Sequence, residues 1–303
     1  MKKVIIWGMG RDYEELRLLF QYYEMINAFS VIGITSEIDD YLYLDGYPFF
    51  KRDEIVKLPF DYLLICSRTF YGSIKREANW AGIPDEKILS AFALQIPGFE
   101  IERYMRLKNQ HMTILANSCW GGATYRKLQW EFRSPLINTY VPAESFLRLM
   151  NGLGESINRP LKFKRNSSEL QDNIIYPIYT LGEGIEIHMP HAADLNQEEQ
   201  KWEERVKRIN FDNIFVAMFT ENIMEAEEFE QLPYSNKVCF VPFQTDFPSC
   251  LTIKTHECRN PHMHINATWY SAYGNAEGLY KEYDVLDIIE GKIRHSSRTQ
   301  TGE

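Results

Sequence analysis

Asn117-Ser118-Cys119-Trp120-Gly121-Gly122 is the stretch that decides the fold, because it lies between an apolar run at 112–116 and a helical pattern at 124–130. A strand, a tight glycine turn and a helix in this order predict an α/β fold. The Cys119 thiol is then expected at the carboxyl edge of a sheet, where the helix dipole and backbone N–H groups favour a thiolate. Cys119 is therefore a candidate nucleophile, with partial access to solvent. The alternative is an inert, buried cysteine.

Two histidines at the end of a predicted strand over 185–189 supply candidate bases for this thiol. A neutral imidazole beside Cys119 can accept its proton, which makes His188 or His191 the base. His188 in an alternating strand is alternatively a hydrogen-bonded core residue. Asp194 and Asp212 are both available as the third member of a triad, and the sequence does not choose between them.

The residues around the cysteine are candidates for the rest of the site. The Asn117 amide and the N–H groups of Gly121 and Gly122 can line an oxyanion site, which places Asn117 among the catalytic candidates. Trp120 and the two glycines are assigned to substrate binding. The alternative for the glycines is that they only allow a sharp turn.

A second group of candidates lies on a predicted helix over 198–209. Trp202 belongs to its apolar stripe, and Arg205 and Arg208 flank that stripe at helical spacing. Planar guanidinium groups hold phosphate or carboxylate by two contacts, so Arg205 and Arg208 are assigned to binding an anionic group in the cleft of Cys119. Trp202 is also assigned to substrate binding. The alternative is an ordinary helix surface on which Glu198 and Glu204 neutralise the cations.

Four residues with soft or borderline donor atoms follow within nine positions: His256, Cys258, His262 and His264. Imidazole and thiolate suit zinc, but this spacing matches no zinc-finger or zinc-ribbon pattern. We assign no metal ligand and no cofactor, and whether these four residues bind a metal stays open.

The first 95 residues alternate predicted strands and helices, which indicates a small parallel sheet. The turn Gly8-Met9-Gly10 is similar to the start of a dinucleotide fingerprint, but Tyr13 occupies the position of its third glycine. Because a phenol ring does not fit there, we expect neither NAD nor FAD in this domain. We predict two α/β domains, at 1–95 and 111–290, the first a small Rossmann-like parallel sheet and the second a mixed sheet with flanking helices.

Composition limits the partners and the compartment. The 303 residues carry a formal net charge of −9, which argues against nonspecific binding to nucleic acid or to an anionic membrane. Five scattered cysteines do not form a disulfide framework, and no run approaches the ~20 apolar residues of a membrane span. We therefore expect a cytoplasmic protein without a transmembrane segment that takes a small anionic substrate.

The first 90 residues resemble the small Rossmann-like domain that precedes the catalytic part of several bacterial sugar-modifying acyltransferases. The resemblance rests on the Gly-x-Gly turn and on Val31-Ile32-Gly33-Ile34, Asp45-Gly46-Tyr47-Pro48 and Phe60-Asp61-Tyr62. It implies a nucleotide-sugar pocket. The alternative is a docking or scaffold domain without a ligand.

Residues 111–255 resemble a bacterial family of unknown function labelled exopolysaccharide biosynthesis proteins, and more distantly a group of cysteine peptidases. The motifs that carry the resemblance are Cys119-Trp120-Gly121-Gly122, Ser134-Pro135, Tyr176-Pro177, Ile187-His188, Trp202-x-x-Arg205-x-x-Arg208-Ile209-Asn210 and Asn236-Lys237-Val238. The resemblance implies a role in surface glycan assembly and names no reaction.

Two hypotheses follow from these patterns. The first is a transferase or hydrolase with Cys119 as nucleophile, acting on a glycan or an activated sugar. The second is a protein that binds an anionic glycan precursor or nucleotide sugar without transforming it. An open cleft with the thiol beside an imidazole favours the first, and a buried thiol favours the second. A metal-dependent enzyme that uses His256 to His264 is a third class.

Overall fold

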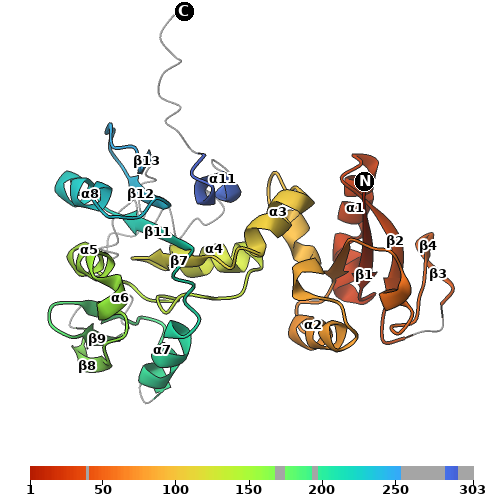
Figure 1. Cartoon of the computed structure of the whole chain (residues 1–303), viewed down its shortest axis with the longest axis horizontal. Coiled ribbons are helices and arrows are strands. Elements are labelled where there is room, and N and C mark those ends of the chain that lie inside the picture. Colours follow the sequence, from red (N-terminus) through yellow and green to blue (C-terminus); the bar gives the residue numbers. More distant parts are fainter. Residues whose placement is uncertain (39–40, 168–174, 193–196, 254–283, 293–303) are drawn as a thin grey trace, which may run out of the picture. The chain divides into compact units, whose positions relative to one another are not determined.

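The computed structural model describes residues 1–38, 41–167, 175–192, 197–253 and 284–292 (Figure 1). The chain divides into two compact units. Unit 1 comprises residues 1–110 and 127–130, and unit 2 comprises 111–126 and the residues from 131 onward. The cluster from His256 to His264 lies outside the described residues.

Unit 1 is built on a four-stranded parallel sheet in the order β2-β1-β5-β6, which confirms the predicted Rossmann-like sheet. The strands are β1 (Lys2–Trp7), β2 (Phe29–Thr35), β5 (Tyr62–Ile65) and β6 (Ile88–Ser90). The helices are α1 (Arg11–Met25), α2 (Tyr71–Trp80) and α3 (Ile101–Lys108), with the 3-10 turns η1 (Ile55–Lys57), η2 (Asp85–Lys87) and η3 (Ala91–Gln95). A short hairpin joins β3 (Tyr43–Leu44) to β4 (Tyr47–Pro48). The central strand β1 is apolar from residue 4 to residue 7 because helices and neighbouring strands bury both of its faces.

Unit 2 holds its parallel and antiparallel strands in two separate sheets. The parallel sheet has the order β13-β12-β11-β7, and the antiparallel sheet has the order β10-β9-β8. The parallel strands are β7 (Thr113–Ala116), β11 (Ile214–Phe219), β12 (Lys237–Val241) and β13 (Cys250–Thr252). The antiparallel strands are β8 (Leu161–Asn166), β9 (Pro177–Leu181) and β10 (Glu186–His188). The mixed character of the second domain therefore comes from two sheets that share one apolar core.

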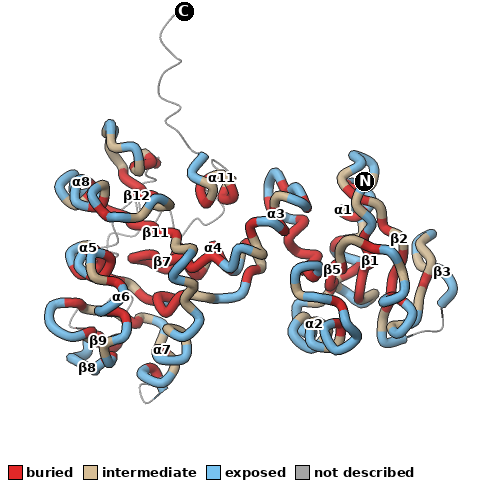
Figure 2. The backbone as a smooth tube through the Cα atoms, in the orientation of Figure 1, coloured by how far each residue is buried: buried red, intermediate tan, exposed pale blue. Residues whose placement is uncertain are grey.

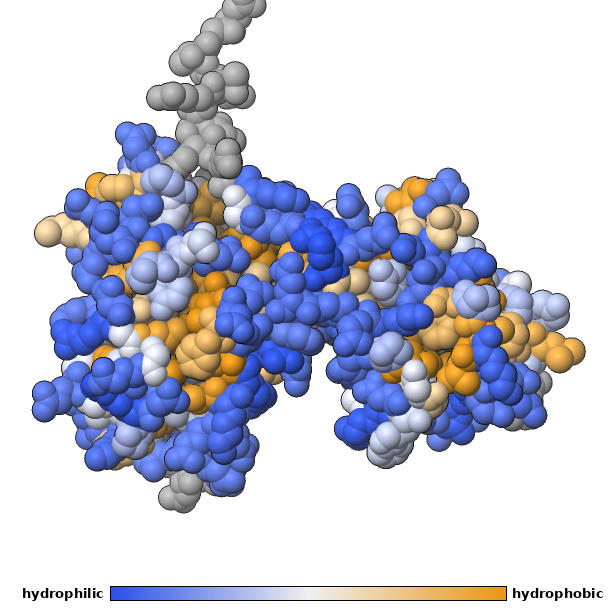
Figure 3. Space-filling view, in the orientation of Figure 1, coloured by the Kyte–Doolittle hydropathy of each residue, from blue (hydrophilic) through white to orange (hydrophobic). Residues whose placement is uncertain are grey.

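Helices complete unit 2. They are α4 (Trp120–Leu128), α5 (Ala143–Asn151), α6 (Leu153–Ser156), α7 (Glu198–Val206), α8 (Ile223–Glu230) and α11 (Val285–Ile289). Figure 2 shows β7 and β11 buried along their length, while the helices alternate buried and exposed residues. On the face seen in Figure 3, hydrophilic side chains cover most of the surface, and hydrophobic ones show between them. Both patterns are typical of helices that pack one side on a sheet.

The helix after β7 begins at Trp120, four residues earlier than the glycine turn predicts. Gly121 and Gly122 are therefore helical residues. A Cβ atom on Gly121 would lie 3.2 Å from the Ala116 Cβ, so this glycine lets α4 pack closely on β7. Trp120 is completely buried and packs against Phe215 and Phe240 of the sheet.

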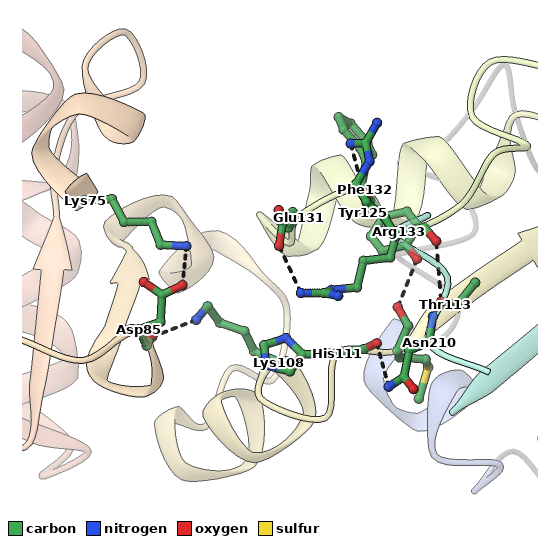
Figure 4. A network of polar contacts seen from close by, with 12 residues as sticks. Lys75, Asp85, Lys108, His111, Thr113, Tyr125, Glu131, Phe132, Arg133 and Asn210 are labelled. Atoms are coloured by element: carbon green, nitrogen blue, oxygen red, sulfur yellow. Dashed lines mark hydrogen bonds and ion pairs between the residues drawn. The ribbon is translucent and has the colours of Figure 1, made fainter. Parts of the chain in front are cut away.

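Polar contacts fix the ends of several elements (Figure 4). In unit 1, Asp85 binds Lys75 at 2.7 Å, and its carbonyl accepts a hydrogen bond from Lys108 at 3.2 Å. In unit 2, the Asn210 backbone donates to the Thr113 hydroxyl at 2.8 Å, and the Asn210 amide donates to the His111 carbonyl at 3.2 Å. Asn210 therefore ties the segment after α7 to the start of β7.

Candidate functional site

Cys119 is the residue immediately before α4, and it is buried. Its side chain is 2 % exposed, and the Sγ atom donates to the Thr139 carbonyl at 3.7 Å. The expectation of a partly accessible thiol is wrong. The physical reason is that the next residue, Trp120, packs into the sheet and carries the start of the helix into the core.

Asn117 forms a structural bridge in this structure. Its amide oxygen accepts the Phe219 N–H at 3.0 Å, and its amide nitrogen donates to the Phe219 carbonyl at 3.1 Å. Both ends of the amide therefore hold the carboxyl end of β7 to that of β11. The structure therefore gives Asn117 a structural role through one amide N–H, and its oxyanion role stays a prediction, since an amide carries two N–H groups.

Trp120 and Trp202, both assigned to substrate binding, lie in the core of unit 2. Their side chains are 0 % and 2 % exposed. Gly121 and Gly122 are also buried, in the first turn of α4. A buried ring or helical glycine offers little surface to a substrate, so the structure gives these four residues a packing role, and their assignment to substrate binding stays a prediction.

His188 lies in β10 between two polar neighbours. Its Nδ1 atom is 3.3 Å from the Tyr176 hydroxyl, and its Nε2 atom is 3.4 Å from the Glu186 carboxylate. Hydrogen bonds from Arg165 and Lys164 lower the pKa of Glu186 to about 2. His191 lies in the exposed turn after β10.

One short segment connects the predicted catalytic residues. The Thr139 carbonyl accepts the hydrogen bond from the Cys119 thiol. Tyr140 and His188 exchange two backbone hydrogen bonds. The Val141 N–H donates to the Asn117 carbonyl at 2.8 Å. The Tyr140 ring also packs edge-on against the imidazole, at 5.4 Å between centroids. The structure thus gathers Asn117, Cys119 and His188 around residues 139–141, with the thiol on a buried side.

Arg205 and Arg208 follow Trp202 on or just beyond α7. Arg205 is half-buried, and burial lowers the pKa of its guanidinium. Arg208 is exposed and donates to the carbonyls of Phe132 and Glu204 at 3.3 and 3.4 Å. Lys201 binds Glu198 at 2.9 Å. These contacts fit the ordinary helix surface better than an anion grip.

A pocket of about 500 Å³ lies at the carboxyl ends of β7 and β11, and we call it the β7/β11 pocket. Its lining includes Asn117, Tyr140, Phe219 and the acidic side chains of Glu144, Glu221 and Glu225. Among the described residues that line it, Cys119, His188, Arg205 and Arg208 do not appear. The predicted anion-binding cleft of Cys119 is therefore not the β7/β11 pocket.

A larger pocket, of about 800 Å³, lies in unit 1 at the carboxyl ends of β1, β2 and β5, and we call it the β1/β5 pocket. Its walls are the turn at 8–12 after β1 and the loop at 66–70 after β5. The chain leaves β1 toward β2 on one side of the sheet and leaves β5 toward β6 on the other. Open α/β sheets bind their ligands in the crevice at such a switch point.

The two turn glycines border this pocket for different reasons. Gly8 has φ +119°, and a Cβ atom there would lie 2.7 Å from the Cys66 carbonyl oxygen. A Cβ on Gly10 would meet no atom within 4 Å. Gly8 therefore makes the turn possible, and Gly10 leaves the N-terminus of α1 open to a ligand.

Charged side chains of both signs line the β1/β5 pocket. Arg52 forms an ion pair with Glu77 at 2.6 Å, and Arg68 forms one with Asp12 at 3.3 Å. Arg11 is exposed at the start of α1. Glu37, just past the end of β2, is on the wall. The sequence pattern singles out neither Glu37 nor Arg52 as a site residue, because only the crossovers of the fold bring them to one edge.

Tyr13 occupies the place of the third fingerprint glycine, as a completely buried side chain of α1. Its hydroxyl donates to Asp45 at 3.0 Å, and burial together with this bond raises the pKa of the phenol.

Within the described residues, no group of three metal-ligating side chains is close enough to hold an ion, and no helix is long and apolar enough to cross a bilayer.

Residues 92–290 match a family model described as a domain of unknown function, DUF1919. The chain belongs to this family. Residues 1–89 match a second model, described as C2185-like, N-terminal. An uncharacterized protein of Haemophilus influenzae is 32 % identical over 210 residues, which is 67 % of this chain and 96 % of the relative.

Proposed function

We propose that this DUF1919 chain is a binding protein of surface-glycan assembly that holds an anionic sugar precursor, a nucleotide sugar, in the β1/β5 pocket. The observation that carries the proposal is the position of that pocket at the switch point of the parallel sheet. Its volume of about 800 Å³ suits a ligand larger than a single sugar.

The lining of the pocket supports a nucleotide in particular. The N-terminus of the 15-residue helix α1 and the open position at Gly10 offer backbone N–H groups to a phosphate, with Arg11 beside them. The Glu37 carboxylate, past the end of β2, accepts hydrogen bonds from a ribose. Tyr13 excludes the close helix packing that a dinucleotide fingerprint requires, so the proposed ligand carries one nucleoside and a sugar.

The link to surface glycans rests on the resemblances of the two parts of the chain, to sugar-modifying acyltransferases and to exopolysaccharide biosynthesis proteins. The proposal retains the cytoplasmic location expected from the scattered cysteines.

A transferase or hydrolase with Cys119 as nucleophile is the second candidate. The observation in its favour is that Cys119 and His188 both contact residues 139–141. Burial of the thiol places it second, because a substrate reaches Cys119 only if this segment moves.

The test is a binding titration of the full chain with nucleoside diphosphate sugars that carry uridine, guanosine or thymidine, followed by calorimetry and thermal shift. A ligand at 100 times its dissociation constant stabilises the state that binds it by ~2.7 kcal/mol. Arg11→Ala and Glu37→Gln should each weaken binding.

Arg17→Ala is the matched control, because Arg17 lies on the same helix and does not line the pocket. No binding of any of these nucleotide sugars, or equal weakening by Arg17→Ala and Arg11→Ala, contradicts the proposal. Micromolar binding of NAD would replace it with a dinucleotide site.

A further inference from the structure

The β7/β11 pocket of unit 2 lies where a parallel sheet presents loops to a ligand. Ala116, the last residue of β7, is paired with Ala217 of β11, and β11 ends at Phe219. The chain then turns into α8 after β11, and α5 begins at Ala143 on another wall of the same pocket. The pocket is therefore open space of about 500 Å³ between three loops with fixed ends.

The loop after β11 is ordered by its own hydrogen bonds. The Thr220 hydroxyl donates to the Glu225 carboxylate and accepts the Asn222 N–H at 3.0 Å. The Asn222 side chain caps α8 by accepting the Met224 N–H at 2.9 Å. A wall that is already ordered loses little conformational entropy when a ligand binds.

The charge of the lining selects the ligand class. Glu144, Glu221 and Glu225 line the pocket, and no lysine or arginine is among the described residues that do so. An ionised carboxylate accepts hydrogen bonds and cannot donate them. Arg148 pairs with Glu144 at 2.9 Å, so Glu221 and Glu225 give the lining its negative charge, which repels phosphates and carboxylates and attracts groups that donate, such as hydroxyls.

One aromatic side chain adds apolar surface to these acceptors. Tyr140 lines the pocket as a half-buried residue, and its ring is held edge-on against His188 at 5.4 Å between centroids. A rigid ring beside several hydroxyl acceptors matches a molecule with an apolar face and a hydroxyl rim. A bare metal ion fits less well, since the described carboxylates do not gather into a metal cluster.

We propose that the β7/β11 pocket binds an uncharged, hydroxyl-rich sugar unit, with the carboxylates of Glu221 and Glu225 accepting its hydroxyl protons. This site is separate from the nucleotide pocket proposed for unit 1. It takes a neutral ligand, whereas the ligand proposed for unit 1 is anionic. A chain with both sites would hold an activated anionic precursor and a neutral glycan.

The experiment uses saturation-transfer NMR and calorimetry on the full chain with three probes: methyl glucoside, methyl galactoside and N-acetylglucosamine. At least one should bind at millimolar concentration, and glucose 6-phosphate should bind at least about tenfold more weakly than the best of the three because the carboxylates repel it. Glu221→Gln and Glu225→Gln should each weaken the sugar about tenfold, since hydrogen bonds to a charged acceptor are the stronger ones.

The matched control is Glu227→Gln, because Glu227 is an exposed residue of α8 outside the pocket. It should leave sugar binding unchanged. The Glu221 variant changes an exposed loop residue, so it keeps the test valid if the Glu225 variant disturbs the loop.

Three results overturn this proposal: no binding of any of the three sugars, equal binding of glucose 6-phosphate, or the same loss with Glu227→Gln as with Glu221→Gln. A preference for glucosamine over N-acetylglucosamine that salt abolishes would identify a cation site instead. Failure of the unit 1 proposal has a separate sign, since Arg11→Ala and Glu37→Gln should not change sugar binding here.

Discussion

The turn after β1 and the turn after β7 share one plan of strand, glycines and helix, yet the helix that follows begins at an exposed residue in the first and at a buried residue in the second. After β1, Gly8 adopts a left-handed conformation and α1 begins at an exposed Arg11. After β7, the helix begins with Trp120, whose side chain enters the core. A strand–glycine–helix pattern therefore locates the edge of a sheet, and the first helical side chain decides whether the start of the helix is open to a ligand.

The reactivity of Cys119 is the sharpest test of this comparison and has the largest expected effect. In the native chain, Cys119 should react with iodoacetamide at least about 100-fold more slowly than in denaturant, because labelling then needs a local opening that costs a few kcal/mol. Mass spectrometry of a labelling time course at neutral pH measures it. Rapid labelling of Cys119 alone would return the residue to the class of nucleophiles.

The next largest contrast is expected between Trp120 after β7 and Phe70 in the β1/β5 pocket, because replacing each by alanine should change stability by very different amounts. Trp120→Ala should cost unit 2 about 3–5 kcal/mol of unfolding free energy, because a completely buried indole leaves a cavity. Phe70→Ala, at a 63 % exposed position of the β1/β5 pocket, should change stability by less than about 0.5 kcal/mol. Urea unfolding checks both, and a small effect of Trp120→Ala would contradict the packing role.

Gly8 and Gly10 form a matched pair in unit 1. Gly8→Ala should destabilise unit 1 by about 1–3 kcal/mol, because it strains a positive φ and places a Cβ against a backbone carbonyl. Gly10→Ala meets open space and should change stability by less than about 0.5 kcal/mol. Thermal unfolding of both variants decides the matter. Equal costs would mean that Gly10 is also needed for the turn.

The strands of the parallel sheets were predictable from sequence because each is a short, continuous apolar run. The apolar run at 214–219 forms β11, and the apolar run at 112–116 forms β7 from Thr113. The start of α4 was not predictable, since Gly121 and Gly122 favour a turn locally, whereas the close packing of Gly121 on Ala116 and the burial of Trp120 are contacts of the folded chain.

The exposure of the candidate site depends on contacts distant in sequence. The partner of Cys119 is Thr139, and the partner of Asn117 is Phe219, more than 100 residues away. No local pattern around the cysteine contains this information. The same holds for Glu37 and Arg52, which reach the β1/β5 pocket from different loops.

Gly121 and Gly122 repeat the glycine comparison inside a helix, with smaller effects. Gly121→Ala should destabilise unit 2 by about 1 kcal/mol, because the close contact with Ala116 exceeds the gain in helix propensity. Gly122→Ala, whose Cβ would have contacts of 3.5 Å or more, should be neutral or stabilising by up to about 1 kcal/mol. Denaturant unfolding compares them, and a reversed order would remove the packing explanation for Gly121.

The smallest expected effect is the pH dependence of the stability that Glu186, whose carboxylate lies beside His188, contributes to the fold. The folded pKa of Glu186 is about 2, because Arg165 and Lys164 bind its carboxylate. A depressed pKa means that this stabilisation is present above the ordinary carboxyl pKa of about 4.3 and is lost as the pH falls toward 2. Both cationic partners are half-exposed, so the contribution should stay below about 1 kcal/mol. Glu186→Gln should therefore be less stable than the natural chain at pH 7, and this gap in unfolding free energy should narrow as the pH approaches 2.

Glu183→Gln, in the exposed turn of the same hairpin, is the control and should show no gap. A gap that persists undiminished at low pH would show that Glu186 acts by packing and not by its charge.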